Sequence, residues 1–213
     1  TKTEEMLIHE LEQGSDEWLN IRELKLTGSN ATAIGNCGAG LKTYVSKIIT
    51  DFISPKKSWK SEDMERGNEL EPIARSKYEF EKGVDVIQVG FIEYNEFVGI
   101  SPDGLVGDDG MIECKARNDE KHLNILMTGE VDSSTIWQMN MQMMVAERKW
   151  CDFISYNPNF KNSFFVKRFY PDTIKIQKLK LGIEEGVKML KKILDEDIVK
   201  EEINFKKQNN ENN

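Results

Sequence analysis

Three charged residues around one predicted turn carry the clearest chemical signal in the chain: Asp103, Glu113 and Lys115. Residues 108–110, Asp-Asp-Gly, fit a three-residue hairpin loop with glycine in the left-handed position. A loop centred on residue 109 would pair Leu105 with Glu113 and Asp103 with Lys115. Because residues two apart on a strand share a face, the three charged side chains are expected to converge.

Two carboxylates beside an ammonium group suit a hard divalent cation. Mg2+ prefers oxygen ligands, which Asp103, Glu113 and the backbone carbonyl of Cys114 could supply. Lys115 would stay protonated beside these anions, where it could orient a water or offset charge on a phosphate. Glu71, on a helix expected before the sheet, is a third carboxylate that could reach the site. An Asp at a strand end and a Glu-x-Lys pair also occur on plain solvated surfaces, so the hairpin alone leaves that alternative open.

The composition excludes several other chemistries. The chain has 213 residues, with 38% hydrophobic and 31% charged residues, as in ordinary globular proteins. Its three scattered cysteines form no CxxC pair, which disfavours a zinc ribbon and excludes a four-cysteine iron–sulfur cluster. Two histidines are too few for a three-histidine zinc site. The net charge of −8 disfavours a protein that coats nucleic acid. It does not exclude an enzyme that binds nucleic acid at one local site.

The hydrophobic pattern predicts a single α/β domain over residues 1–213, with a core of about 14–205 and a flexible tail at 206–213. Helices are expected at 15–24, near 31–34, and at 41–52, 61–82, 122–127, 133–146 and 173–202, with a loop at 35–40 and a kink or restart at Pro72. Strands are expected at 84–94, 97–101, 104–107, 111–116, 151–156 and 164–170. These form a central mixed sheet flanked by helices. No apolar run is long enough to span a membrane and the N-terminus is polar, which favours the cytoplasm.

Arg22 belongs to a second candidate group. It follows Trp18 by one helical turn and precedes the hydroxyls of Thr27 and Ser29, and an arginine with two hydroxyls at a helix N-terminus suits a phosphate. The alternative is a salt bridge for Arg22 and a plain N-cap for Ser29. Five lysines could follow a DNA backbone or simply be solvated: Lys42, Lys47, Lys56, Lys57 and Lys60.

Six short motifs in order resemble the phage lambda exonuclease family, also called YqaJ-type viral recombinases, of the PD-(D/E)xK nuclease superfamily. They are GSxxWxxxR from residue 14, TGS from 27, RGNELEP from 66, SPDG from 101, IECK from 112 and WQMNMQ from 137. The resemblance runs from about residue 14 to 170. It implies a restriction-endonuclease-like core.

The resemblance also implies roles for individual residues. Asp103, Glu113 and Glu71 match the metal-binding carboxylates, Lys115 matches the catalytic lysine, and Gln138 matches a glutamine beside the centre. A pocket for the DNA 5′-phosphate is implied by matches at Arg22, Thr27, Ser29 and Ser101. Trp18 and Asn140 are expected DNA contacts, although Asn140 stands where relatives often have a second glutamine. One or two ions of Mg2+, or of Mn2+ in its place, are the implied cofactor.

The implied activity is 5′→3′ exonuclease digestion of linear double-stranded DNA that has a 5′-phosphorylated end. Family members form ring-shaped homotrimers and work with a single-strand annealing protein in phage-type recombination, so a phage or prophage protein in a bacterial cytoplasm is expected. Two alternatives remain. An endonuclease of the same superfamily would cut a closed circle, and a DNA-binding module with an inactive site would bind DNA without turnover.

Overall fold

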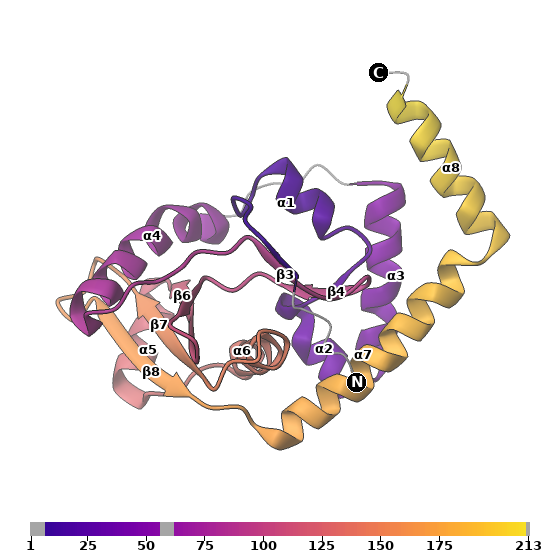
Figure 1. The fold of residues 1–213 in the computed structure, drawn as a ribbon. Helices are drawn as coiled ribbons and strands as arrows, with labels where there is room; N and C mark the ends of the chain where they lie inside the picture. The colour runs from indigo at the N-terminus through magenta and orange to yellow at the C-terminus, as the bar shows by residue number, and fades with distance from the viewer. Residues whose placement is uncertain (1–6, 56–61, 212–213) are drawn as a thin grey trace.

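Two four-stranded mixed sheets form the centre of the computed structural model, which describes residues 7–55 and 62–211 (Figure 1). The first sheet has the order β1-β3-β4-β2, from β1 (Leu7–His9), β2 (Leu26–Thr27), β3 (Phe91–Asn95) and β4 (Val98–Ile100). The second has the order β5-β6-β7-β8, from β5 (Gly104–Val106), β6 (Gly110–Ala116), β7 (Trp150–Tyr156) and β8 (Phe164–Phe169). The predicted mixed α/β architecture is confirmed, with two sheets in place of one.

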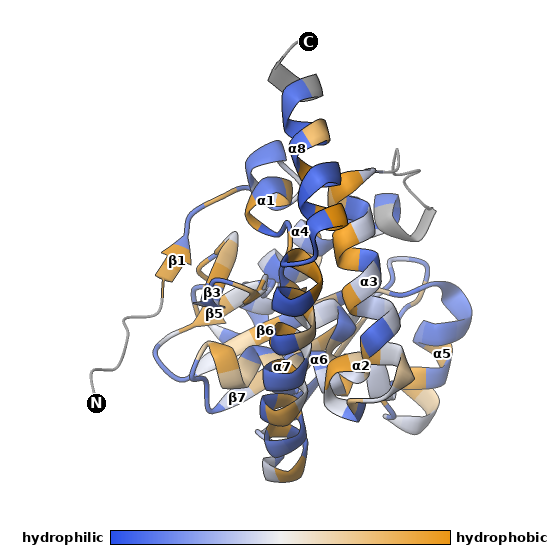
Figure 2. Cartoon of the chain, turned by 90° about the vertical axis from the view of Figure 1, so that its right-hand side faces the viewer, coloured by the Kyte–Doolittle hydropathy of each residue, from blue (hydrophilic) through white to orange (hydrophobic). Residues whose placement is uncertain are grey.

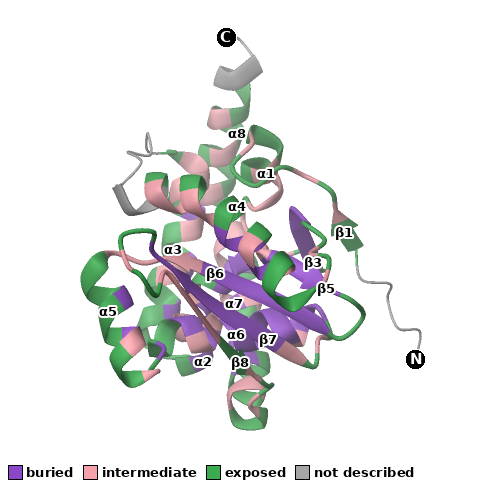
Figure 3. Cartoon of the chain, turned by 90° about the vertical axis from the view of Figure 1, so that its left-hand side faces the viewer, coloured by how far each residue is buried: buried purple, intermediate pink, exposed green. Residues whose placement is uncertain are grey.

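Helices cover both sheets. They are α1 (Asp16–Ile21), a 3-10 turn η1 (Gly28–Asn30), α2 (Ala31–Asn36), α3 (Ala39–Ile53), α4 (Glu62–Lys82), α5 (Asp119–Thr128), α6 (Ser133–Val145), α7 (Thr173–Leu194) and α8 (Asp197–Glu211). Helix α4 lies against β6 and β7, whose buried strands stand out in Figure 3. Helix α6 packs on η1, α2 and strands of both sheets, and α7 packs on α2 and α3. None of the described helices is both long and apolar enough to cross a membrane.

Local sequence explains where several elements begin and how closely they approach. Ser15 caps α1, because its side chain accepts a hydrogen bond from the backbone N–H of Trp18. Gly182 allows α7 to cross α2, since a Cβ there would overlap the carbonyl oxygen of Ile34. Gly35 likewise makes room for the ring of Trp137 on α6. These contacts draw α2, α6 and α7 into one layer beside the sheets.

Two of the predicted boundaries, those of the loop at 35–40 and of the strand at 84–94, are wrong. The loop at 35–40 shrinks to two residues between α2 and α3, with Cys37 left-handed at φ 49°. In place of the strand expected at 84–94, regular strand structure begins only at Phe91. Gly90, just before it, lies against the backbone of Leu11. Helix α4 continues through Pro72 without a restart. The lysines at 56, 57 and 60 lie outside the described residues.

The C-terminal segment also differs from the prediction. The long helix expected at 173–202 ends at Leu194, and α8 then runs to Glu211, so residues 206–211 are helical in place of a flexible tail. Composition alone favours fraying there, but Lys206 bonds to the carbonyl oxygen of Phe52 and lies 3.7 Å from Glu23. These tertiary contacts hold α8 against α3.

A buried ion pair joins the second sheet to α4. Asp152 on β7 is only 2% exposed and receives two hydrogen bonds from Arg168 on β8, at 2.7 and 2.8 Å. The hydroxyl of Tyr78 on α4 donates a third at 2.7 Å. The guanidinium of Arg168 also stacks on Trp150, 3.6 Å from the ring centroid. Every oxygen of the buried carboxylate therefore has a donor.

Replacing Arg168 by methionine is expected to lower the free energy of unfolding by about 3 kcal/mol, because it leaves the charge of Asp152 buried with a single donor. Urea denaturation measures the change. Lys188→Met is the control, since that lysine is 79% exposed and its loss should change stability by no more than about 0.5 kcal/mol. A loss of under about 1 kcal/mol for Arg168→Met would show that the pair is not structurally important.

Candidate active site

The β5–β6 hairpin positions the predicted catalytic group. Its register pairs Leu105 with Met111 and Val106 with Gly110, so the turn is residues 107–109 and the predicted pairing was two residues out. Gly107 takes the left-handed position at φ 53° in place of Gly110, which stays in the strand beneath the ring of Trp150. A shift of two residues keeps every side chain on its predicted face. The expected convergence therefore survives the error in register.

Asp103, Glu113 and Lys115 lie together as expected. The Nζ atom of Lys115 is 2.5 Å from Oε1 of Glu113, whose side chain is fully buried. Oδ2 of Asp103 accepts a hydrogen bond of 2.6 Å from the backbone N–H of Cys114. The side chain of Cys114 points the other way and packs, with Ile112, in the apolar cluster beneath α4. Alternation along β6 thus gives the strand one face with the charged side chains and one core face.

Glu71 on α4 completes a cluster of three carboxylates. Burial and the charge of Glu113 raise the pKa of Glu71, while Arg75 and a hydrogen bond with Asp103 oppose the rise. Burial, with the charges of Glu113 and Glu71, raises the pKa of Asp103 well above its usual value. Burial alone would lower the pKa of Lys115, but the charges of Glu113 and Asp103 raise it. Burial is thus the largest cause of both raised carboxyl pKa values, and the neighbouring carboxylates add to it.

The donor chemistry fits a hard divalent cation, although the side chains now face protein partners. Within the described residues, no three His, Cys, Asp or Glu side chains are grouped closely enough to hold a metal ion. Glu113 faces Lys115, and Asp103 faces the N–H of Cys114. The three carboxylates nevertheless supply the oxygen ligands that such cations prefer, and a cation would offset the charges of Glu113 and Glu71, which add to the effect of burial in raising the pKa of Asp103.

Gln142 on α6 contacts the cluster, and its position was not predicted. Its Nε2 donates to Oε2 of Glu113 at 2.8 Å, and the side chain is only 1% exposed. The predicted Gln138 is half-exposed one turn earlier, and both glutamines flank Gly28. The spacing of 138 and 142 placed both residues on one helix face, but it could not show which one reaches Glu113.

Asn140 has a different environment from the one predicted. It is 2% exposed, its Nδ2 donates to the carbonyl of Ile136, and its Oδ1 accepts the N–H of Asp172 at 2.7 Å. Both ends of the amide are therefore engaged within the fold, where they fix the start of α7. The expected DNA contact conflicts with this burial.

Arg22 lies in the second predicted group, at the end of α1. Its Nη1 donates to Oγ of Ser101 at 3.0 Å, and its guanidinium carbon lies 4.0 Å from the centroid of the Trp18 ring. The indole N–H of Trp18 donates to the same Ser101 oxygen at 2.9 Å. Burial lowers the pKa of Arg22. In the described part of the chain Arg22 forms no ion pair with a carboxylate, so its charge is available to an anion.

The predicted hydroxyls lie beside this arginine. Thr27 and Ser29 line a cavity of about 260 Å³ together with Arg22, and their oxygens are 3.3 Å apart. The same cavity is lined by Tyr44 of α3. The structure thus brings Arg22, Thr27 and Ser29 together, with Ser101 bonded to the arginine.

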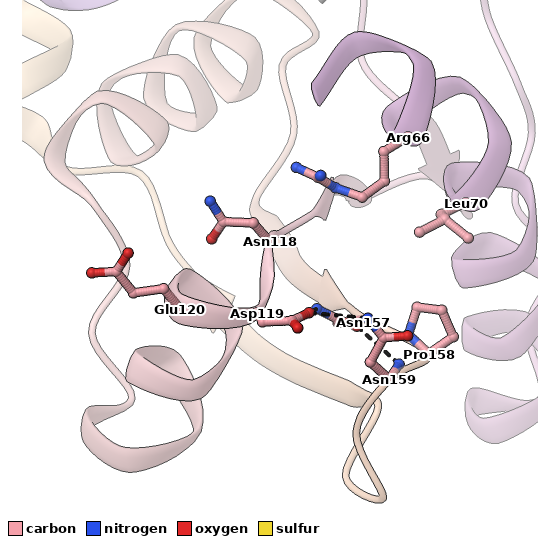
Figure 4. A pocket seen from close by; sticks show the side chains of 8 residues that line it. All are labelled: Arg66, Leu70, Asn118, Asp119, Glu120, Asn157, Pro158 and Asn159. Atoms are coloured by element: carbon pink, nitrogen blue, oxygen red, sulfur yellow. Dashed lines mark hydrogen bonds between the residues drawn. The ribbon is translucent and has the colours of Figure 1, made fainter. Parts of the chain in front are cut away.

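Another cavity, of about 570 Å³, lies where the chain leaves β6 (Figure 4). The amides of Asn157 and Asn159 point to the Asp119 carboxylate, to which they donate at 2.8 and 3.1 Å. Glu120 adds a second carboxylate at the rim. Its two carboxylates outnumber its one cationic side chain, Arg66, so this cavity is a poor anion site.

The fold and the carboxylate–lysine cluster define a nuclease of the PD-(D/E)xK class. The model of the YqaJ-like viral recombinase domain matches residues 17–149, more than half of the chain. The chain therefore belongs to the YqaJ-like viral recombinase domain family.

Solved structures agree with this assignment. LHK-Exo in complex with dAMP is 32% identical with a TM-score of 0.78, over 85% of this chain and 95% of that one. The alkaline exonuclease LHK-Exo from Laribacter hongkongensis is 30% identical with a TM-score of 0.75, over 93% and 99%. A phage-related exonuclease from Haemophilus somnus 129PT shares the fold, with 16% identity and a TM-score of 0.61 over 82% and 97%. No curated protein matches the chain significantly.

Replacing Gln142 by methionine is expected to lower the free energy of unfolding by about 2 kcal/mol, because Glu113 then lacks a donor in a buried setting. Gln138→Met makes the same change one turn earlier, at a half-exposed residue, and should cost about 0.5 kcal/mol or less. Urea denaturation of both variants gives the comparison. Equal losses would show that the bond to Glu113 contributes nothing specific.

Proposed function

We propose that the protein is a divalent-metal-dependent 5′→3′ exonuclease that digests one strand of linear double-stranded DNA. The observation that carries the proposal is the juxtaposition of two features. Arg22, which is partly buried and has no ion-pair partner among the residues that the structure describes, is bonded to Ser101, and the carboxylate cluster begins at Asp103. Two residues span at most about 7 Å of chain. A phosphate held at Arg22 would therefore lie close to the hydrolytic cluster.

The chain's own residues have distinct tasks in this proposal. Asp103, Glu113 and Glu71, with the carbonyl of Cys114, would hold Mg2+ or Mn2+, as one or two ions. A bound divalent cation supplies Lewis-acid activation of phosphate and water. Lys115 keeps its proton and offsets the charge that develops on the phosphate. Gln142 fixes the carboxylate of Glu113, and Gln138 stands at the half-exposed edge where it can orient a water.

The pocket at Arg22 would make the enzyme act from DNA ends. A terminal 5′-phosphate carries more charge than an internal one and needs no room for a continuing chain. Arg22, Thr27 and Ser29 offer a cation and two hydroxyls in a small cavity, and Ser101 holds the arginine in place. Trp18 supports the guanidinium from beneath. Anchoring a terminal phosphate favours an exonuclease over an endonuclease.

Assembly and partners follow from the family. We propose a ring-shaped homotrimer that works with a single-strand annealing protein in phage-type recombination, as a phage or prophage protein in a bacterial cytoplasm. The outer sides of α7 and α8 support an assembly surface, because hydrophobic residues interrupt their hydrophilic face (Figure 2). The large apolar side chains exposed there are Ile174, Leu181, Ile198 and Phe205.

Digestion of two DNA substrates tests the activity. We expect loss of the 5′-phosphorylated strand of a linear duplex with Mg2+, none with EDTA, and an intact closed circle. Lys115→Ala should bind the duplex but degrade it at least about a hundredfold more slowly, since one electrostatic group contributes about 10²–10³ in rate. A cut circle would indicate an endonuclease, and binding without degradation by the wild type would indicate a DNA-binding module.

Replacing Arg22 by alanine should erase the preference for a 5′-phosphate over a 5′-hydroxyl end. A hydrogen bond to a charged group contributes about 1.5–3 kcal/mol, so the ratio of kcat/KM values should fall about tenfold or more. Lys192→Ala, an exposed lysine on α7, is the control and should keep the ratio. An unchanged ratio in Arg22→Ala would remove this arginine from the pocket.

A further inference from the structure

Tyr44 of α3 occupies a position in the Arg22 cavity that neither the motifs nor the proposed mechanism use. Its hydroxyl oxygen accepts a hydrogen bond of 3.0 Å from the backbone N–H of Thr27. The same oxygen lies 3.2 Å from Oγ1 of Thr27, which is 3.3 Å from Oγ of Ser29. The side chain is half-buried and lines the cavity with Arg22. Three hydroxyls therefore form a continuous chain beside the arginine.

The two ends of this chain limit the directions that its protons can take. At one end the N–H of Thr27 can only donate, so the hydroxyl of Tyr44 must direct its own proton elsewhere. At the other end Nδ2 of Asn30 donates to Oγ of Ser29 at 3.3 Å. If Tyr44 donates to Thr27 and Thr27 donates to Ser29, the proton of Ser29 is left for a ligand. In that arrangement the hydroxyl chain donates into the cavity.

We propose that Tyr44 is a specificity-determining residue, which aligns the Thr27 and Ser29 hydroxyls as donors and so selects a phosphomonoester at the DNA 5′ end. The inference rests on the proposed function of this pocket. A phosphomonoester offers oxygens that only accept hydrogen bonds, and it pairs with the charge of Arg22, which forms no ion pair within residues 7–55 and 62–211. A 5′-hydroxyl end lacks this charge and competes as a donor. Without the Tyr44 hydroxyl, Thr27 and Ser29 can rotate to accept, and the pocket discriminates less.

The test compares binding of duplexes that carry a 5′-phosphate or a 5′-hydroxyl end, with EDTA present so that no turnover occurs. In the wild type the phosphorylated end should bind more tightly. Tyr44→Phe keeps the ring and removes the hydroxyl, and it should reduce the ratio of the two Kd values about tenfold, or about 1.4 kcal/mol. Each ratio is taken within one variant, so a general loss of stability affects both duplexes alike.

Two further variants sharpen the result. Tyr170→Phe makes the same change at a tyrosine that is 66% exposed, and it should leave the ratio unchanged. Ser29→Ala removes the last hydroxyl of the chain, and the double variant with Tyr44→Phe should lose little more than Ser29→Ala alone. Additive losses would show that the two hydroxyls act independently, and would overturn the aligned chain.

The outcomes separate this inference from the proposed function. If the wild type does not distinguish the two ends, the pocket holds no terminal phosphate and both ideas fail. If the wild type distinguishes them, and Arg22→Ala loses the preference while Tyr44→Phe keeps it, only the role of Tyr44 fails. Loss in both variants supports the role of Tyr44 in selecting the 5′-phosphate.

Discussion

The fully buried carboxylate of Glu113 is the constraint on which the site depends. An ionised carboxylate removed from water is costly unless it is paired and hydrogen-bonded. Here Lys115 pairs with one oxygen and Gln142 donates to the other. These partners come from β6 itself and from α6, so the charge can stay buried only while the helix remains packed beside the strand. Catalytic geometry and tertiary packing are therefore coupled through one side chain.

The same constraint explains why β6 is central. Its alternate residues serve two environments, because Glu113 and Lys115 face the polar cluster while Ile112 and Cys114 pack beneath α4. Strands β5 and β7 flank it on both sides, so β6 has no free edge that could shift. Helix α4 then serves twice, covering the apolar face and bringing Glu71 to the carboxylates. A rigid strand with a covering helix positions charges more accurately than a loop would.

Sequence reasoning could predict what depends on local alternation and could not predict what depends on packing. The shared face of Asp103, Glu113 and Lys115 followed from the two-residue period, which a register error of two residues does not disturb. The contact of Gln142 with Glu113 depends on how α6 sits against the sheet, which no spacing along one helix reveals. The position of the Tyr44 hydroxyl beside Thr27 could not be predicted either, because helical periodicity indicates which side chains are buried and not what a polar atom at the end of one contacts.

Two arginines, Arg168 and Arg22, differ in whether the fold already neutralises their charge. Arg168 donates twice to the buried Asp152 and stacks on Trp150, so its charge is already neutralised within the fold. Arg22 has a similar stacking contact with an indole ring, but its side chain donates to the neutral hydroxyl of Ser101, and it forms no ion pair among the described residues. Glu23 and Asp51 also line its cavity, but they pair with Lys206 and Lys47. The charge of Arg22 therefore adds little to stability, and in the proposed function it binds a phosphate beside the carboxylate cluster.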